Sequence, residues 1–105
     1  MSKRERDKGL RGELEVAHIF AQHGLQLRNL EGSGDQLVIL PGYMTRLLHV
    51  EVKRQERLCI PDWNRQAARE APDGTIPVVC YRRSREPWYA SLPLDQFLNL
   101  VDGRQ

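Results

Sequence analysis

The stretch LLHVEVKRQ, residues 47–55, holds a carboxylate and an amine two positions apart within an apolar run. Apolar and polar residues alternate there with a period of two, which is typical of a β-strand. Glu51 and Lys53 therefore share one face of the expected strand. Alone they could form an ion pair on a half-exposed sheet, but the apolar neighbours indicate a central strand, where a buried carboxylate needs a partner.

A second carboxylate, Glu13, lies in the helix expected over residues 8–23. Positions three and four apart share a helical face, which places Glu13 within the apolar stripe and turns Glu15 toward water. The stripe comprises Leu10, Leu14, Ala17 and Ala21, with Val16 and Phe20 beside it. Taken alone, Glu13 would be interpreted as a glutamate at the helix edge that meets an arginine.

Asp35 follows the turn EGSG, residues 31–34, and opens the next expected strand. An aspartate in a turn is common, so it also has a purely structural interpretation. One hypothesis covers Glu13, Asp35 and Glu51 together: they converge to hold a hard divalent cation such as Mg²⁺, which binds oxygen ligands. Lys53 could then orient a water molecule or offset charge in a transition state. This set suits metal-assisted hydrolysis of a phosphodiester.

The remaining pattern supplies the elements that must position these residues. Apolar periodicity and turn signals predict the order α-β-β-β-α-β-β-α, which indicates an α/β fold with a mixed central β-sheet flanked by helices. Helices are expected over residues 8–23, 62–71 and 93–101, and strands over residues 25–30, 35–40, 46–54, 77–83 and 87–92. The last two strands enclose the polar turn RSRE and are expected to form a hairpin. Gly24 is expected to end the first helix in the left-handed conformation.

The composition is typical of a small globular protein. The chain has 105 residues, of which 40% are hydrophobic and 29% charged, enough for one domain over residues 1–105 with a modest core. No apolar run could cross a bilayer and the charged start lacks a signal-peptide core, so a cytoplasmic protein without a membrane partner is expected. Cys59 and Cys80 have no metal-ligand spacing and are expected to be free thiols.

The distribution of charge is more informative than the net charge of +2. Basic residues gather in three clusters: Lys3, Arg4, Arg6, Lys8 and Arg11; Lys53, Arg54 and Arg57; and Arg82, Arg83 and Arg85. Any one cluster could be solvated surface. Three clusters around the same carboxylates would suit a phosphate backbone.

At this point the residues match a known family. Asp35 and the EVK of residues 51–53, with a glutamate on a preceding helix, resemble the PD-(D/E)XK nuclease superfamily. The segment KGLRGELEVA, residues 8–17, is similar to the start of Holliday-junction resolvases of archaeal and phage type. The residues in matching places there are Lys8, Gly9 and Glu13. The later WNRQA, PVVCYRR and PWYASLPLDQFL segments are similar to small phage-encoded members, so the resemblance runs through nearly the whole chain.

This resemblance implies a restriction-endonuclease-like core, a homodimer, and Mg²⁺ as a cofactor that Mn²⁺ can replace, with no nucleotide cofactor. It assigns the metal to Asp35, Glu51 and the backbone carbonyl of Val52, with Glu13 completing the shell or holding a second ion. Lys53 would position the attacking water, and cleavage would leave a 5′-phosphate and a 3′-hydroxyl. The residues implied to bind substrate are Lys8, Gly9, Arg11, Ser33, Arg54 and Gln66.

The chain departs from the family pattern in particular places. Gly34, rather than proline, precedes Asp35, and Ser33 matches only loosely a serine that archaeal members carry. Gln66 lies three positions from Trp63 on the inner face of its helix, and it could support the active site or be a polar residue at the helix edge. Related nucleases combine such a glutamine with a tyrosine, but position 70 is glutamate here.

The first hypothesis is therefore a Mg²⁺-dependent endonuclease that selects branched DNA, most simply a four-way junction, in recombination or repair. Two active sites held by a dimer would cut opposing strands, and the basic clusters would contact phosphates rather than bases. A nicking, repair or restriction-type nuclease of the same superfamily is the nearest alternative. A non-catalytic DNA-binding subunit, or one inactive until it docks on a larger assembly, is a further alternative, although Asp35, Glu51 and Lys53 are all present.

Other residues have simpler structural interpretations. His49 shares the Glu51 face and could approach substrate, but a packed sheet histidine is the simpler reading. Trp63 and Trp88 could stack on bases, yet they are expected in the core or at a dimer interface. Residues 78–83 and the last helix are the candidate dimer elements because of their apolar content.

Overall fold

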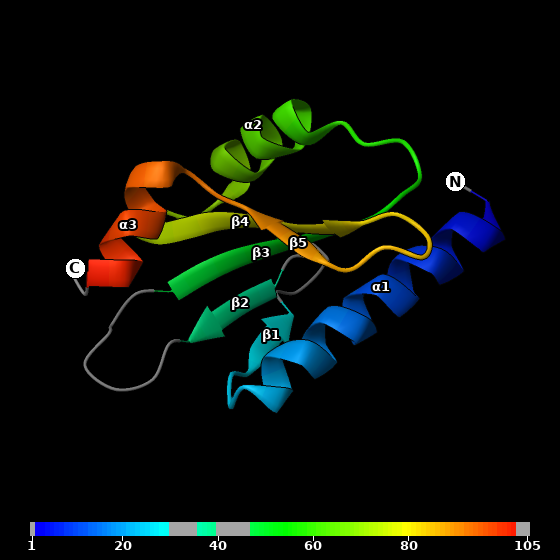
Figure 1. The fold of residues 1–105 in the computed structure, drawn as a ribbon, viewed down its shortest axis with the longest axis horizontal. Coiled ribbons are helices and arrows are strands. Elements are labelled where there is room, and N and C mark those ends of the chain that lie inside the picture. The colour runs from blue at the N-terminus through cyan, green and yellow to red at the C-terminus, as the bar shows by residue number, and fades with distance from the viewer. Residues whose placement is uncertain (1, 30–35, 40–46, 103–105) are drawn as a thin grey trace.

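The structure is a computed structural model that describes residues 2–29, 36–39 and 47–102. Within these residues, helices and strands follow one another in the predicted order (Figure 1). The helices are α1 (Lys3–Gln22), α2 (Ile60–Glu70) and α3 (Leu94–Asp102), and the strands are β1 (Leu27–Asn29), β2 (Gln36–Ile39), β3 (Leu47–Arg54), β4 (Thr75–Arg82) and β5 (Tyr89–Ser91). None of these helices is long and apolar enough to cross a membrane. The predicted α/β class is confirmed.

The strands form one mixed sheet in the order β1-β2-β3-β4-β5. β3 and β4 pair in parallel, whereas the other neighbours are antiparallel, including the predicted β4–β5 hairpin. A parallel pair needs a long crossover connection, which α2 supplies. Runs of consecutive buried residues in β3 and β4 show that the strand carrying EVK is central.

Different helices cover the two faces of the sheet, which lies between α1 and α2 in Figure 1. The core cluster on the α1 side comprises Val16, Leu48, Val50, Ile76, Val78 and Cys80. The cluster on the α2 side comprises Trp63, Ala67 and Val79. Trp63 therefore belongs to the core, as expected. The two sides are apolar but differ in extent, and the smaller α2 cluster leaves room for polar residues.

Successive residues of β3 point to opposite sides of the sheet. Val52 packs against the α1 cluster, and the Arg54 side chain contacts α1. Glu51 pairs in register with Val79 of the α2 cluster, and Lys53 contacts α2 directly. One strand thus presents the EVK acid and amine to one helix and the following arginine to the other.

α1 begins at Lys3 rather than at residue 8. Ser2 caps it: the Ser2 hydroxyl accepts the Glu5 backbone N–H at 3.1 Å, and the Glu5 carboxylate accepts the Ser2 N–H at 3.3 Å. This capping box satisfies two backbone donors that the helix start would otherwise leave without partners. Gly24 follows the helix with a φ of +76°, as predicted. The first basic cluster consequently lies along a helix.

The predicted apolar stripe of α1 is wrong at its two leucines, because Leu10 and Leu14 are 58% and 70% exposed. Val16 and Phe20, expected beside the stripe, do pack on the core, and Gly12 is buried with them. A Cβ added at Gly12 would lie 2.9 Å from the Cβ of Arg54, so the absence of a side chain there allows α1 to approach β3 closely. α1 thus approaches β3 at a residue without a side chain, and we infer that this helps decide which face of the helix is buried.

The expectation that Glu15 points toward water is also wrong. Glu15 is half-buried, and its Oε1 accepts hydrogen bonds from Arg82 Nε and Trp88 Nε1, both at 3.1 Å. The Arg82 guanidinium lies 5.6 Å from the centre of the Trp88 ring, within range of a cation–π interaction. Trp88 therefore packs within the chain and joins α1 to the β4–β5 hairpin.

The two candidate dimer elements differ in exposure. Residues 78–80 are buried because their side chains belong to the core clusters on the two faces of the sheet, so the proposal of residues 78–83 as an exposed apolar element is wrong there. In α3 no residue is buried. Its apolar side chains remain exposed: Leu94, Phe97, Leu98 and Val101.

Candidate active site

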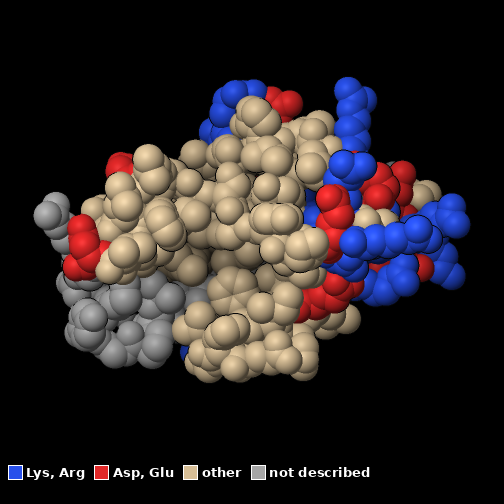
Figure 2. Space-filling view, in the orientation of Figure 1, with Lys and Arg blue, Asp and Glu red and all other residues tan. Residues whose placement is uncertain are grey.

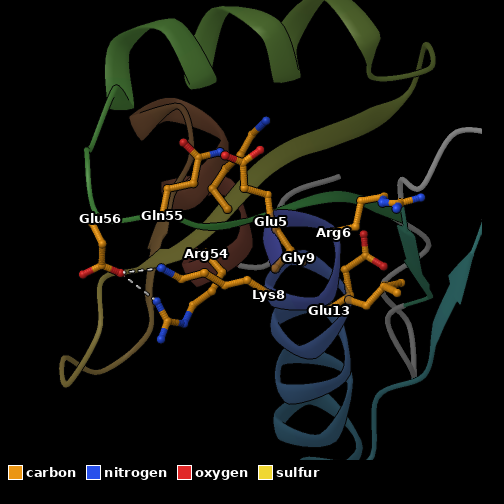
Figure 3. A pocket seen from close by; sticks show the side chains of 11 residues that line it. Glu5, Arg6, Lys8, Gly9, Glu13, Arg54, Gln55 and Glu56 are labelled. Carbon is orange, nitrogen blue, oxygen red and sulfur yellow. Dashed lines mark hydrogen bonds and ion pairs between the residues drawn. The ribbon is translucent and has the colours of Figure 1, made fainter. Parts of the chain in front are cut away.

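A cavity of about 750 Å³ lies between the first half of α1 and the end of β3 (Figure 3). Residues of the predicted site on its wall are Lys8, Gly9 and Glu13 from α1, and Val52, Lys53 and Arg54 from β3. The remaining wall residues are Glu5, Arg6, Leu10, Gln55 and Glu56. The fold thus brings residues of the KGLRGE segment and Val52, Lys53 and Arg54, which are distant in the sequence, to one cavity, whereas Glu51 is not a wall residue.

Glu51 and Lys53 form a buried pair rather than an exposed one. Glu51 is 5% exposed, and the Lys53 side chain is 20% exposed. Lys53 Nζ lies 3.9 Å from Glu51 Oε2 and donates a hydrogen bond to Gln66 Oε1 at 3.4 Å. Gln66 of α2 therefore contacts the predicted catalytic lysine. Because Lys53 also lies on the cavity wall, it connects this buried group to the open space.

Glu70 is a further member of this group. Its carboxyl hydrogen-bonds with the Glu51 side chain, and its Oε1 accepts a hydrogen bond from Gln66 Nε2 at 3.2 Å. The hydrogen bond with Glu51 lowers the pKa of Glu70, and the hydrogen bond from Gln66 and the charge of Lys53 act in the same direction. The sequence analysis noted Glu70 only as a departure from a family pattern. Its spacing of four from Gln66 places both on one helical face and would have identified it.

The other predicted residues are placed less completely. Glu13 is half-buried on the cavity wall, whereas Arg11 is exposed and is not a wall residue. Ser33 and Asp35 lie outside the described residues. Among the residues that the structure does describe, no group of three or more histidine, cysteine, aspartate or glutamate side chains is placed to hold a metal ion. The predicted metal ligand set therefore remains a prediction that requires Asp35.

The donor atoms present suit a hard cation. Glu51 and Glu70 bring carboxyl oxygens together, and Mg²⁺ commonly takes one or two carboxylates and completes its shell with water. Glu51 and Glu70 therefore offer the kind of oxygen donor that Mg²⁺ or Mn²⁺ takes.

Glu56 lies at the centre of an ion-pair group on the cavity wall. Its Oε2 accepts hydrogen bonds from Lys8 Nζ at 2.9 Å and from Arg54 Nη1 at 3.0 Å, shown as dashed lines in Figure 3. The hydroxyl and backbone N–H of Ser84 also donate to its carboxylate, at 2.8 Å and 3.1 Å. Lys8, then Ser84 and Arg54, lower the pKa of Glu56 to about 2. The spacing of these residues in the sequence gave no signal of this group.

The histidine and cysteines near the site take structural positions. His49 is 1% exposed in the centre of β3, which confirms the expectation of a packed histidine. Cys59 and Cys80 are free thiols, as expected. Burial raises the pKa of Cys80 to about 12, so this thiol is neutral at physiological pH.

The chain matches no protein family, curated protein or solved structure.

Proposed function

We propose that the protein is a Mg²⁺-dependent, structure-selective DNA endonuclease of the PD-(D/E)XK type, acting on four-way junctions. The observation that carries this proposal is the buried Glu51–Lys53 pair, which Gln66 and Glu70 contact and from which Lys53 reaches a cavity lined by both basic and acidic residues. A buried acid and amine placed side by side next to an accessible cavity are costly for stability alone. They are useful where a charged substrate must be hydrolysed.

Each residue has a stated role in this proposal. Glu51, which faces α2, would hold the cation together with Asp35 and the Val52 carbonyl, and Glu13, which lines the cavity from α1, would hold a second ion. When bound, the cation would polarise the phosphoryl group and lower the pKa of a bound water. Lys53 keeps its ammonium group directed by Gln66, where it can orient a water or offset negative charge on the phosphate.

The fold is consistent with a restriction-endonuclease-like core. A mixed sheet with α1 on one side and α2 on the other carries the EVK residues on its central strand. The described residues match the predicted order of elements throughout. We therefore extend the proposal to the fold family as well as to the chemistry.

The substrate proposal follows from the charges around the cavity. The wall carries Arg6, Lys8, Lys53 and Arg54, which suit phosphates, and phosphate contacts position DNA without reading its sequence. Selection would then depend on the shape of branched DNA. We propose a homodimer that places two sites on opposing strands, products with a 5′-phosphate and a 3′-hydroxyl, and a cytoplasmic location.

Cleavage of a labelled four-way junction beside a matched linear duplex tests this proposal. Wild type, Glu51→Gln and Glu86→Gln should be assayed in Mg²⁺ and in EDTA. Glu86→Gln is the matched control because it removes the same charge from an exposed turn residue paired with Arg83. We expect Mg²⁺-dependent junction nicks that Glu51→Gln lowers at least about 100-fold and Glu86→Gln leaves unchanged.

The outcomes separate the alternatives. Retained junction binding by Glu51→Gln, with a native circular dichroism spectrum, would assign the loss to chemistry. Equal cutting of the linear duplex would keep the nuclease and reject junction selectivity. Tight junction binding without any cutting by the wild type would reject the enzyme and favour a DNA-binding subunit.

A further inference from the structure

Three segments far apart in the sequence donate hydrogen bonds to the single carboxylate of Glu56. Lys8 comes from α1, Arg54 ends β3, and Ser84 lies in the turn between β4 and β5. Figure 1 shows the start of α1, the β4–β5 turn and the β3–α2 connection at the same end of the molecule. In Figure 2 lysine and arginine side chains gather at that end, mixed with acidic ones.

The donors around Glu56 are those that bind phosphate groups in proteins. An ammonium, a guanidinium, a hydroxyl and a backbone N–H point toward the same oxygens, at distances between 2.8 Å and 3.1 Å. Charged donors of this kind form strong hydrogen bonds to any anionic oxygen. The Glu56 carboxylate therefore occupies a position that a phosphate could take with the same partners.

One donor, Arg54, is held more firmly than the acceptor. The Arg54 side chain is 13% exposed because its stem packs against Gly12, and its Nη2 donates a further hydrogen bond to Ser84 Oγ at 3.2 Å. Glu56 is 52% exposed and lies in the irregular connection between β3 and α2. It can rotate into water without unpacking the core, whereas Arg54 cannot.

The group lies on the wall of the candidate active-site cavity. Lys8, Lys53, Arg54 and Glu56 all line it. Arg54 follows Glu51 by three residues, about 10 Å along an extended strand.

We propose that Lys8, Arg54 and Ser84 form a phosphate-binding site that Glu56 fills in the free protein and that a backbone phosphate of DNA takes over on binding. The Glu56 carboxylate then competes with the DNA phosphate for the same hydrogen-bond donors. The identification of DNA as the source of the phosphate rests on the proposed function, but the anion site itself does not depend on cleavage.

The first test is junction binding in EDTA, measured by fluorescence anisotropy with wild type, Glu56→Gln and Asp7→Asn. Asp7 is exposed on the same helix beside Lys8 and loses the same charge. Glu56→Gln breaks the ion pairs of Glu56 with Lys8 and Arg54 and leaves both cations available to the DNA. We therefore expect the variant to bind the junction about threefold to tenfold more tightly than wild type, against less than about twofold for Asp7→Asn. Equal effects of the two variants would overturn internal competition, since net charge alone would then explain both.

A second measurement covers the case in which Glu56→Gln perturbs the fold. The backbone amide signal of Ser84 is followed by NMR in wild type during titration with inorganic phosphate and, separately, with a short duplex. A shift with the duplex supports the proposal. A shift with inorganic phosphate alone would assign the site to free phosphate and reject the DNA assignment, and no shift with either would reject the anion site.

The cleavage assay distinguishes this proposal from the proposed function. Tighter binding by Glu56→Gln without cleavage by the wild type would keep the phosphate site and reject the nuclease. Cleavage without any preferential effect of Glu56→Gln would keep the nuclease and reject the phosphate site.

Discussion

Substitution of the two glycines in α1 gives opposite results according to the structure. A Cβ at Gly9 would meet no atom within 4 Å, whereas a Cβ at Gly12 would lie 2.9 Å from Arg54 Cβ and 3.5 Å from the Trp88 ring. Replacement of glycine by alanine inside a helix stabilises a protein by about 0.5–1 kcal/mol when nothing obstructs the new methyl group. Gly9→Ala should therefore be more stable than wild type by about that amount.

Gly12→Ala gains the same helical preference but meets an obstruction. The obstructing atom is the first carbon of a side chain on the central strand, so α1 or β3 must move to relieve the contact. Overpacking of this kind costs about 1–3 kcal/mol. Both variants gain the same stabilisation from placing alanine in a helix, so this gain cancels when the two are compared. The free energies of unfolding of Gly9→Ala and Gly12→Ala should therefore differ by the overpacking cost alone, about 1–3 kcal/mol.

Urea-induced unfolding followed by far-ultraviolet circular dichroism measures this difference. Both variants should unfold with the slope of the wild type, so that the midpoints report stability alone. Equal stability of Gly9→Ala and Gly12→Ala would refute the argument. It would mean that the close approach of α1 to β3 does not decide which face of the helix is buried.

Three further predictions concern single side chains. Lys53→Ala should slow cleavage by about 10²–10³-fold while Mg²⁺ dependence persists, and a full rate would remove this lysine from the mechanism. A thiol reagent at pH 8 should modify Cys59 in the native protein and Cys80 only after unfolding, because burial raises the pKa of Cys80 to about 12; two rapidly reacting thiols would contradict this. The lowered pKa of Glu56 stabilises the native state above pH 4.5 and loses this effect as the pH falls toward 2, so urea midpoints of wild type should drop more steeply than those of Glu56→Gln across that range. Parallel pH profiles would show that the ion pairs of Glu56 add nothing to stability.

Short-range patterns explain the part of the fold that the sequence predicted well. The alternation in residues 47–55 placed the central strand almost to the residue, because a strand buried on both sides has few ways to be interrupted. Gly24 and the turn before β5 marked ends of elements because glycine and polar turns have specific backbone requirements. The shared face of Glu51 and Lys53 followed from the same period of two.

Long-range contacts explain what the sequence did not reveal. The buried face of α1 depends on the approach of Gly12 to Arg54, and such an approach between distant segments leaves no periodic signal. Glu56 meets Lys8 and Ser84 from distant parts of the chain for the same reason. Glu70 could have been predicted as a partner of Gln66, because residues four apart share a helical face. It was noted only because related nucleases are expected to carry a tyrosine at that position.

The two-sided character of β3 has a consequence for how the chain can change. Glu51 and Lys53 face α2, while Val52 and Arg54 face α1, and the parity of the strand fixes this division. Deletion or insertion of one residue within β3 would exchange the two sets, sending the arginine toward Gln66 and the lysine toward Gly12. Insertions or deletions therefore leave the side chains of β3 on their correct faces only if they lie beyond Arg54, in the connection that carries Glu56. Such changes would move Glu56 relative to Arg54 without altering which side chains face α1 and which face α2.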